Sequence, residues 1–339
     1  MTVLVTGGAG YIGSHMVLDL MKTGEEIVVL DDFSTGFPGL VPVGVRVVEG
    51  DIGNRKLLER LIPDYRIDAI AHFAAKIVVP ESVEKPLFYY DNNTSRARTL
   101  IEAVVNGGVK HFIFSSTAAV YGNAETMPVT EETPPNPVSP YGRSKLMVEW
   151  MLEDARVAYG IEPMILRYFN VAGADPLCRS GQATPRATHL IKTAVEAAVG
   201  KRAGMSIFGT DYPTADGTCV RDYIHVSDLA RAHVLALDYL RKGGKGQVLN
   251  CAYGHGSSVS DVIETVRKVS GVNFNVETAP RRAGDPAEIV ATGEKIRSVL
   301  GWKPQYDDLE TIVTHALAWE RKLMDQSRQA DARAALATV

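Results

Sequence analysis

The chain has 339 residues, of which 45% are hydrophobic and 22% are charged, and this balance is typical of a globular protein with a sizeable core. That length fits two domains or one large α/β unit and is too great for a single small module. The 36 basic and 40 acidic residues leave a formal net charge of −4, which argues against a surface built to bind a nucleic-acid backbone.

We expect no metal site, no disulfide framework and no membrane span. The cysteines Cys178, Cys219 and Cys251 lie far apart and form no C-x-x-C pair, which is typical of free thiols in a reducing cytoplasm. No apolar run is long enough to cross a bilayer. A strand-like run begins already at Thr2 with no targeting signal ahead of it, so we expect a cytoplasmic chain that is not exported.

The first half of the chain alternates strand-length apolar runs with helical segments. Continuous apolar runs indicate strands that are buried on both faces, as in a parallel sheet covered by helices. The expected strands are residues 3–5, 27–30, 45–48, 69–73 and 112–114, and the expected helices are residues 12–23, 54–62, 87–106 and 141–159. This order predicts a Rossmann-type, doubly wound α/β fold.

After another apolar run at residues 164–169 the alternation loosens, and the chain becomes richer in Gly, Pro and small polar residues. Helices are expected near residues 188–199, 227–240, 260–269 and 309–322. We interpret residues 1–170 as a cofactor-binding domain and residues 171–325 as a smaller, mixed α/β substrate domain, from which residues 221–250 can return to the first domain. Residues 326–339 are expected to form a frayed tail or a loose helix.

A glycine-rich turn, VLVTGGAGYIGSH, joins the first expected strand to the first expected helix. Its Gly7, Gly10 and Gly13 let the backbone approach a diphosphate, and the helix N-terminus behind them attracts negative charge. The second expected strand ends in Asp31 and Asp32, whose carboxylates can bond ribose hydroxyls and would repel a 2′-phosphate. This context predicts a site for NAD in preference to NADP.

Asp51 follows the third expected strand in the sequence GDI and has two interpretations. It either contacts the adenine of the cofactor or caps the N-terminus of the helix that is expected from residue 54.

A second constellation combines the end of one strand with the start of a helix. FSSTAAVYG supplies Ser115 and Thr117, and SPYGRSKLMVE supplies Tyr141 and Lys145, which are four residues apart and share one helical face. The ammonium favours the phenolate, so we expect the pKa of Tyr141 to fall from about 10 toward neutrality, and further beside a nicotinamide. With Thr117 holding the substrate oxygen, the trio predicts hydride transfer from a secondary alcohol, with Tyr141 as the base.

The segments TGGAGYIGSH, FSSTAAVYG, SPYGRSKLMVE, LRYFNVAGA, IFGTDYPTADGTCVRDYIHV and PRRAGDPA together resemble the UDP-glucose 4-epimerase family of the extended short-chain dehydrogenases. The resemblance runs in order to about residue 325. It implies a homodimeric isomerase of galactose and carbohydrate metabolism that holds NAD tightly. Such an enzyme interconverts UDP-glucose and UDP-galactose through a transient 4-keto sugar, which turns in the pocket before it is reduced again.

The resemblance also implies a role for individual positions. The implied catalytic residues are Thr117, Tyr141 and Lys145. The implied cofactor contacts are Gly7, Gly10, Tyr11, Ile12, Gly13, Asp31, Asp32, Asp51, Ile52, Phe73, Ala74, Asn92, Ser115, Tyr141, Lys145 and Tyr168. The implied substrate contacts are Thr117, Asn170, His189, Leu190, Phe208, Arg221, Arg282, Asp285 and Ile289. Arginines can fork onto a diphosphate and a phenylalanine can stack on uracil, which fits these assignments.

Two positions depart from the family pattern. His189 stands where the family often has asparagine, and Lys76 lies one residue early for a lysine that contacts the cofactor, so the contacts of both residues are open. His72 and His225 lie in apolar, strand-like segments and are expected to be packed and hydrogen bonded, not catalytic.

Ile289 bears on the choice of sugar. In the resembled family, the residue four places after the aspartate that matches Asp285 lines the pocket beside the 2-substituent of the sugar. An isoleucine of intermediate volume would exclude an N-acetyl group only in part, so UDP-glucose and UDP-galactose are the expected main substrates. The alternative is that Ile289 packs within a strand over residues 287–291.

Other functions remain open from the sequence. Sugar-nucleotide dehydratases need an acid and base after the threonine, and Ala118 and Ala119 at those positions disfavour dehydration. A 4-epimerase for UDP-N-acetylhexosamines, uronic acids or pentoses, or a dehydrogenase that releases NADH, would use the same Tyr–Lys pair. A sensor or scaffold that binds NAD without turnover would keep the fold alone.

Overall fold

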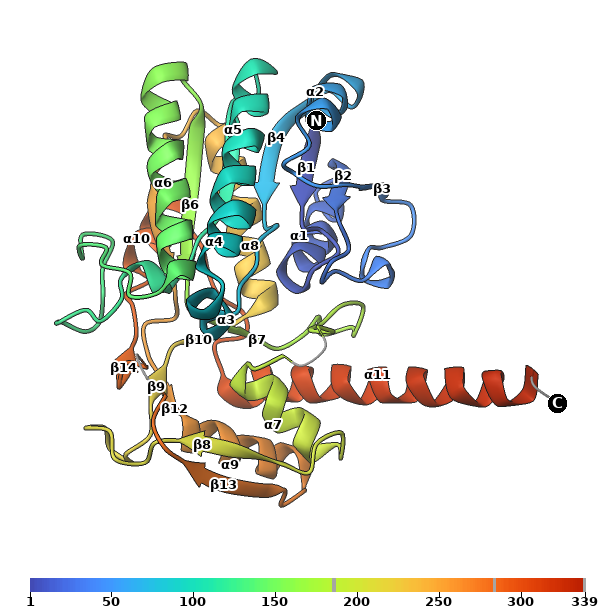
Figure 1. Ribbon diagram of the computed structural model, residues 1–339, viewed down its shortest axis with the longest axis vertical. Helices are drawn as coiled ribbons and strands as arrows, with labels where there is room; N and C mark the ends of the chain where they lie inside the picture. Colours follow the sequence, from blue (N-terminus) through green and yellow to red (C-terminus); the bar gives the residue numbers. More distant parts are fainter. Residues whose placement is uncertain (185–186, 283–284, 338–339) are drawn as a thin grey trace.

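The computed structural model describes residues 1–184, 187–282 and 285–337 (Figure 1). Its main element is a seven-stranded parallel sheet in the order β11-β6-β5-β4-β1-β2-β3. The strands are β1 (Thr2–Thr6), β2 (Glu26–Asp31), β3 (Arg46–Glu49), β4 (Ile67–His72), β5 (His111–Ser115), β6 (Glu162–Tyr168) and β11 (Val248–Cys251). The sheet grows in one direction from β1 to β3 and in the other from β4. The expected Rossmann-type fold is confirmed, and its strand order reverses between β1 and β4, where folds of this type bind their ligands.

Helices cover both faces of this sheet because successive side chains of each strand point to opposite sides. Val3 and Val5 pack in one core with α1 (Tyr11–Met21) and α8 (Val226–Arg241). Leu4 packs in the other core with the remaining helices of the sheet. These are α2 (Arg55–Asp64), α5 (Arg96–Asn106) and α6 (Pro140–Tyr159). Both faces are therefore apolar, as the unbroken apolar runs predicted.

The segment expected as one helix over residues 87–106 consists of three pieces. These are α4 (Pro86–Tyr89), η2, a π-helical turn (Tyr90–Ser95), and α5. The short α3 (Val79–Glu84) precedes them, and short 3-10 turns form η1 (Pro38–Leu40) and η3 (Ala118–Val120). The other expected helices of this half agree with α1, α2 and α6 to within a few residues.

A smaller group of elements lies below the carboxyl ends of the main strands in Figure 1. Its strands form small sheets: β7 (Asn170–Ala172) with β10 (Tyr223–His225), β8 (Gly204–Phe208) with β13 (Asn275–Ala279), and β9 (Val220–Arg221) between β12 (Ser257–Ser258) and β14 (Glu288–Ile289). Its helices are α7 (Leu190–Ala198), α9 (Val259–Ser270) and α11 (Leu309–Ala337). The short α10 (Glu294–Leu300) packs instead against β11 and α8, beside the main sheet. Residues 221–250 contribute α8 and β11 to the main sheet layer, so the chain crosses between the two groups more than once.

The C-terminal helix is longer than the helix expected over residues 309–322. It continues to Ala337, so the described part of the tail is helical, one of the two alternatives expected for it. Figure 1 shows its last turns extending away from the rest of the molecule. The sequence after residue 326 is rich in Ala, the residue that most favours helix without tertiary packing.

Candidate active site

The glycine-rich turn lies between β1 and α1, at the carboxyl end of the central strand. Gly7 has φ +71°, a conformation that L side chains rarely adopt. A Cβ on Gly13 would lie 2.2 Å from the Gly7 oxygen, so the turn closes only with glycine there. Gly10 is the N-cap of α1 and has no side chain to accept from the first N–H groups of the helix. The turn therefore fits the diphosphate of a dinucleotide.

Asp31 ends β2 and faces this turn. Its Oδ2 accepts from the Ala9 N–H at 2.9 Å and its Oδ1 accepts from the Phe33 N–H at 2.9 Å. Burial raises the pKa of the Asp31 carboxyl, against the effect of these two hydrogen bonds. The carboxylate is thus held in place at the edge of the glycine turn before any ligand binds.

Asp32 and Lys76 are both hydrogen bonded to Ser34, close to Asp31 at the end of β2. Asp32 Oδ1 accepts from the N–H and the hydroxyl of Ser34 at 2.9 and 2.6 Å, and Lys76 Nζ donates to Ser34 Oγ at 2.7 Å. Burial opposes ionisation of Asp32, but the bonds from Ser34 outweigh it and lower its pKa. Lys76 therefore lies at the end of β2, where the adenosine ribose is expected.

Asp51 does not cap α2. Asn54 is the N-cap, since its side chain accepts from the Leu57 N–H at 3.2 Å. The interpretation of Asp51 as a helix cap is therefore wrong. Asp51 Oδ1 accepts from the Gly53 N–H at 2.6 Å, and its other oxygen is paired with Arg96. Its contact with adenine stays a prediction.

The other expected cofactor positions surround the same crevice. The segment after β4 touches the glycine turn, because a Cβ on Gly7 would lie 2.7 Å from the Ala74 nitrogen. The Phe73 N–H donates to the Thr6 oxygen, which joins the ends of β4 and β1. Asn92 is buried in η2 and donates to Asn93 Oδ1 at 3.0 Å. Ile52, which follows β3, is buried in the core that also contains Leu30 and Leu58.

The structure brings the expected catalytic residues together at the ends of β5 and α6. Ser139 caps α6 by accepting from the Gly142 N–H at 3.2 Å. A Cβ on Gly142 would lie 2.6 Å from the Ala119 oxygen, so α6 packs directly on the turn that follows Thr117. This close packing places Tyr141, in the first turn of α6, beside the strand end.

Lys145 is buried one turn after Tyr141, and its Nζ donates to the Ser115 carbonyl oxygen at 2.9 Å. The hydroxyl of Ser115 forms a hydrogen bond with the phenol of Tyr168 in β6. Thr117 Oγ1 accepts from the Ala119 N–H at 3.1 Å. The five residues share one buried corner of the crevice.

The electrostatics of this corner correct one expectation. Burial raises the pKa of Tyr141, and the hydrogen bond with Thr117 only partly opposes it. Burial also lowers the pKa of Lys145 to about 7. The expected fall in the Tyr141 pKa is therefore wrong for the protein's own residues, because desolvation disfavours the phenolate more than the hydrogen bond with Thr117 favours it.

The expected substrate residues lie in the loops and short strands opposite this corner. The Arg282 guanidinium lies 3.8 Å from the centre of the Phe208 ring, and Arg221 Nη2 lies 3.4 Å from Asp285 Oδ1. Arg221 in β9 is also in register with Ile289 in β14. Two arginines and one aromatic ring therefore gather on the side of the smaller group of elements.

Ile289 lies in a strand and packs, as one of its two interpretations expected. Its strand is shorter than predicted, covering Glu288–Ile289, with a single bridge at Ala291. The side chain is half-buried against a core cluster that includes Ala118, the neighbour of Thr117. The role as a gate stays a prediction.

The remaining substrate positions begin two elements. Asn170 starts β7, where its N–H donates to the Asp222 oxygen at 3.0 Å. His189 is the N-cap of α7 and Leu190 its first residue. His189 Nδ1 lies 2.8 Å from Gln182 Nε2, so its ring already has a hydrogen-bond partner.

His72 and His225, which were expected to be packed and not catalytic, are packed as predicted. His72 Nδ1 is hydrogen bonded to Thr6 Oγ1 at 2.7 Å, and burial lowers its pKa to about 3. His225 accepts from the Ser227 N–H at 3.0 Å and lies 3.0 Å from His315.

Cys178, Cys219 and Cys251 are free. Over the described residues no helix could cross a membrane, and no group of three or more His, Cys, Asp or Glu could hold a metal.

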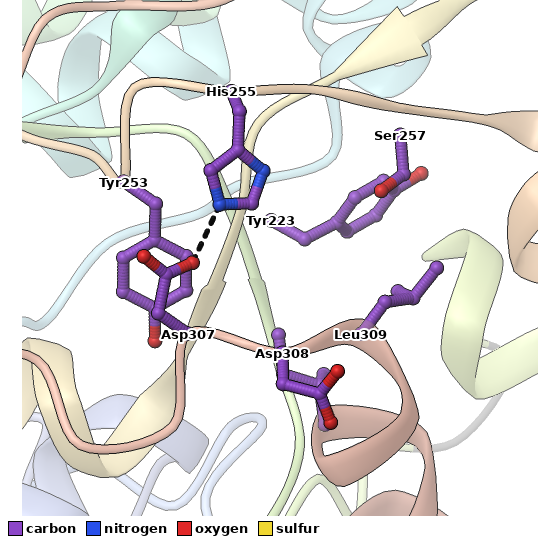
Figure 2. Close-up of a pocket in the computed structure, with 8 residues that line it drawn as sticks. Tyr223, Tyr253, His255, Ser257, Asp307, Asp308 and Leu309 are labelled. Atoms are coloured by element: carbon purple, nitrogen blue, oxygen red, sulfur yellow. Dashed lines mark hydrogen bonds and ion pairs between the residues drawn. The ribbon is translucent and has the colours of Figure 1, made fainter.

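A second hollow lies away from this corner, beside the start of α11. Figure 2 shows His255 and Asp307 meeting there, with Nε2 and Oδ1 2.6 Å apart, and Tyr223 and Tyr253 nearby. Its volume of about 10 Å³ has room for no more than one water molecule. No expected site residue lines it.

Sequence reasoning missed two features of the site. Tyr11 was expected as a cofactor contact, but its hydroxyl donates to the Gly173 oxygen at 2.7 Å and ties α1 to the smaller group of elements. Glu149 lies four residues after Lys145 and forms a buried ion pair with Arg167. The four-residue spacing between Lys145 and Glu149 can be read from the sequence. The pairing of Glu149 with Arg167 on β6 cannot.

Comparison with known proteins agrees with this geometry. Residues 3–252 match the model of the NAD dependent epimerase/dehydratase family. The chain belongs to this family. A UDP-glucose 4-epimerase of Azospirillum brasilense is 56% identical over 330 residues, which are 97% of this chain and 95% of that protein. The resemblance seen in the sequence is confirmed.

Solved structures of family members share the fold. The UDP-glucose 4-epimerase from Brucella ovis, crystallised in complex with NAD, has a TM-score of 0.91 and 42% identity, covering 94% of this chain and 97% of that one. The UDP-Glc/GlcNAc 4-epimerase from Campylobacter jejuni has a TM-score of 0.83 and 50% identity, covering 95% of this chain and 99% of that one.

Proposed function

We propose that the protein holds NAD and interconverts UDP-glucose and UDP-galactose by epimerisation at C4 of the sugar. The observation that carries this proposal is the convergence of Thr117, Tyr141 and Lys145 at the carboxyl end of β5, at the same edge of the sheet as the glycine turn after β1. The relationship of the whole chain to UDP-glucose 4-epimerases supports the same reaction.

The protein's own groups would hold both ligands. The glycine turn and the first N–H groups of α1 receive the cofactor diphosphate, and Asp31 and Asp32 receive its adenosine ribose. Arg221 and Arg282 fork onto the diphosphate of the sugar nucleotide, and Phe208 stacks on uracil. When bound there, NAD would supply the hydride acceptor and donor that the reaction at C4 requires.

Thr117, Tyr141 and Lys145 carry out the proton transfer. Thr117 holds the 4-oxygen of the sugar by a hydrogen bond to its hydroxyl. Tyr141 takes the proton from that oxygen and gives it back when the oxidised sugar, a 4-keto intermediate, is reduced. Lys145, fixed by the Ser115 carbonyl, places a positive charge near the phenol and so favours the transfer.

The test is to incubate the purified protein with UDP-galactose and no added cofactor, and to measure UDP-glucose by chromatography. Product formation is expected, with a matched Lys145→Met variant as the inactive control. An absence of product from a folded protein that carries NAD would contradict the proposal and favour a silent NAD-binding protein.

A second substrate class is favoured by Ile289 and by the Campylobacter jejuni relative, which is a UDP-Glc/GlcNAc 4-epimerase. We expect weak activity on UDP-N-acetylhexosamines. The ratio of kcat/KM for UDP-GalNAc and UDP-galactose should fall in Ile289→Tyr and rise in Ile289→Ala. A ratio that stays constant in both folded variants would show that Ile289 only packs.

We further propose a cytoplasmic homodimer. The free cysteines are compatible with a reducing compartment. Large apolar side chains are exposed on α4 and α6, with Leu87 at 80% and Trp150 at 59%, and this surface can pair with a second copy. Light scattering should give twice the chain mass, and Leu87→Arg with Trp150→Glu should give the monomer. A monomeric parent protein would contradict the dimer.

A further inference from the structure

A buried ion pair lies directly behind the proposed catalytic residues. Glu149 in α6 is 4% exposed and Arg167 in β6 is 5% exposed. Arg167 Nη2 lies 2.5 Å from Glu149 Oε2, and Arg167 Nε lies 3.1 and 3.2 Å from the two carboxylate oxygens. Because both charges lose their hydration, such a pair contributes little net stability, so its location is the informative observation.

The Glu149 carboxylate is also bonded to the strand end that carries the site. The hydroxyl of Ser116 donates to Glu149 Oε1. Ser116 stands between Ser115, whose carbonyl accepts from Lys145, and Thr117, which is expected to hold the substrate oxygen. One carboxylate therefore joins α6 to the backbone between two site residues.

The surroundings of Lys145 contain little negative charge besides Glu149. Its ammonium lies 5.0 Å from the centre of the Phe114 ring, in an apolar environment. The titratable and charged groups packed around it are Tyr141 and Glu149 on its own helix, His72 on β4, and Arg167 and Tyr168 on β6. Burial lowers the pKa of Lys145 to about 7, and the Glu149 carboxylate opposes this fall.

Neither His72 nor the phenols of Tyr141 and Tyr168 can supply a negative charge beside Lys145. His72 is neutral because burial, together with the nearby charge of Lys145, lowers its pKa to about 3. Burial also raises the pKa values of Tyr141 and Tyr168, so both phenols are protonated in the free protein. Glu149 is thus the carboxylate on which the charge of Lys145 depends.

We propose that Glu149 is a positioning residue for the reaction: held by Arg167, it fixes the Ser115–Thr117 turn against α6 and keeps Lys145 cationic at the working pH. The inference rests on the proposed roles of Tyr141 and Lys145. Glu149 acts through these groups and touches no reacting atom.

The test removes both charges together, since Glu149→Gln alone would leave Arg167 buried without its partner. In Glu149→Gln with Arg167→Met, the new amide oxygen can still accept from Ser116, and no buried charge is left over. Loss of the carboxylate should let Lys145 deprotonate at lower pH. We expect the alkaline limb of the kcat profile to move by about one pH unit toward acid, and kcat on that limb to fall about tenfold.

Two control variants separate this effect from a change in packing. Arg167→Lys keeps a cation beside Glu149 and should leave the alkaline limb in place. Asp68→Asn and Glu25→Gln with Arg241→Met removes another partly buried ion-pair group, in which Arg241 bridges both carboxylates near the amino ends of β1 and β4, and should also leave the limb unchanged. Melting temperatures would show that all variants are folded.

A readout without turnover separates the inference from the proposed function. Cyanate modifies neutral amines, so the rate of carbamylation of Lys145, measured by peptide mass spectrometry at pH 7, should rise in the Glu149→Gln/Arg167→Met protein. A rise with no epimerase activity in any variant would support the inference and reject the proposed function. An unmoved alkaline limb and unmoved carbamylation rate in the folded double variant, or equal movement in the Asp68/Glu25/Arg241 control, would overturn the inference.

Discussion

Tyr141 is placed for proton transfer, but the free protein does not ionise it. Its phenol is buried at the end of β5, where desolvation raises its pKa and only the Thr117 hydroxyl opposes the rise. The base must therefore become effective when substrate and cofactor fill the crevice. Sequence spacing revealed the Tyr–Lys pair, but it could not reveal this burial, and so the predicted direction of the pKa shift was wrong.

Replacing Tyr141 by Phe tests the base directly. The variant should keep its fold and bound NAD, since the hydroxyl makes no contact with the glycine turn, and kcat should fall by a factor of about 10² to 10⁴. The checks are kcat, the melting temperature and the NAD content after denaturation. Near-normal turnover with an unchanged pH profile would assign the proton transfer to another group.

At the scale of elements, continuous apolar runs were enough to locate most strands of the main sheet. Residues 3–5 and 27–30 are strands because both of their faces meet helices. Features that depend on partners distant in sequence were not predictable. The pairing of β11 with β6 and the partner of Glu149 needed the folded chain, although the return of residues 221–250 to the first domain was expected. The Asn54 cap of α2 is a local feature that the interpretation of Asp51 as the cap overlooked. The glycine turn was predictable because its constraints are local.

The tie between α1 and the smaller group of elements is such a distant contact. Tyr11 donates to the Gly173 oxygen at 2.7 Å, and Ser14 Oγ lies 2.6 Å from Ser180 Oγ. Tyr11→Phe removes one hydrogen bond and leaves a buried carbonyl, which should lower the free energy of unfolding by about 1 kcal/mol.

The same variant should retain NAD, because the cofactor would be held by backbone N–H groups, and it should raise KM for the UDP-sugar more than it lowers kcat. Ser14→Ala, which loses the neighbouring tie, is the matched comparison. If Tyr11→Phe released NAD while KM stayed unchanged, Tyr11 would belong to the cofactor site and not to this tie.

At the scale of the whole molecule, buried histidines predict the response to acid. Burial lowers the pKa values of His15 and His233 to about 4 and those of His72 and His225 to about 3. The unfolded chain binds these protons near pH 6.5, so stability is complete above that pH and decreases as the pH falls toward 3.

The melting temperature should therefore fall steadily between pH 6.5 and pH 4, and the fall should be smaller in His72→Gln. A scan of melting temperature against pH checks this, with Glu59→Gln on the exposed face of α2 as a control. A flat curve over that range would show that these histidines are protonated in the folded protein.

The central claim is that hydrogen leaves C4 and returns to the same carbon within one protein molecule. The most direct measurement uses UDP-galactose labelled with tritium at C4, incubated with the enzyme and an excess of free, unlabelled NAD. The account predicts that the label is recovered at C4 of UDP-glucose. Label in free NADH or in water would contradict it, because the hydrogen would then have left the site before the second transfer.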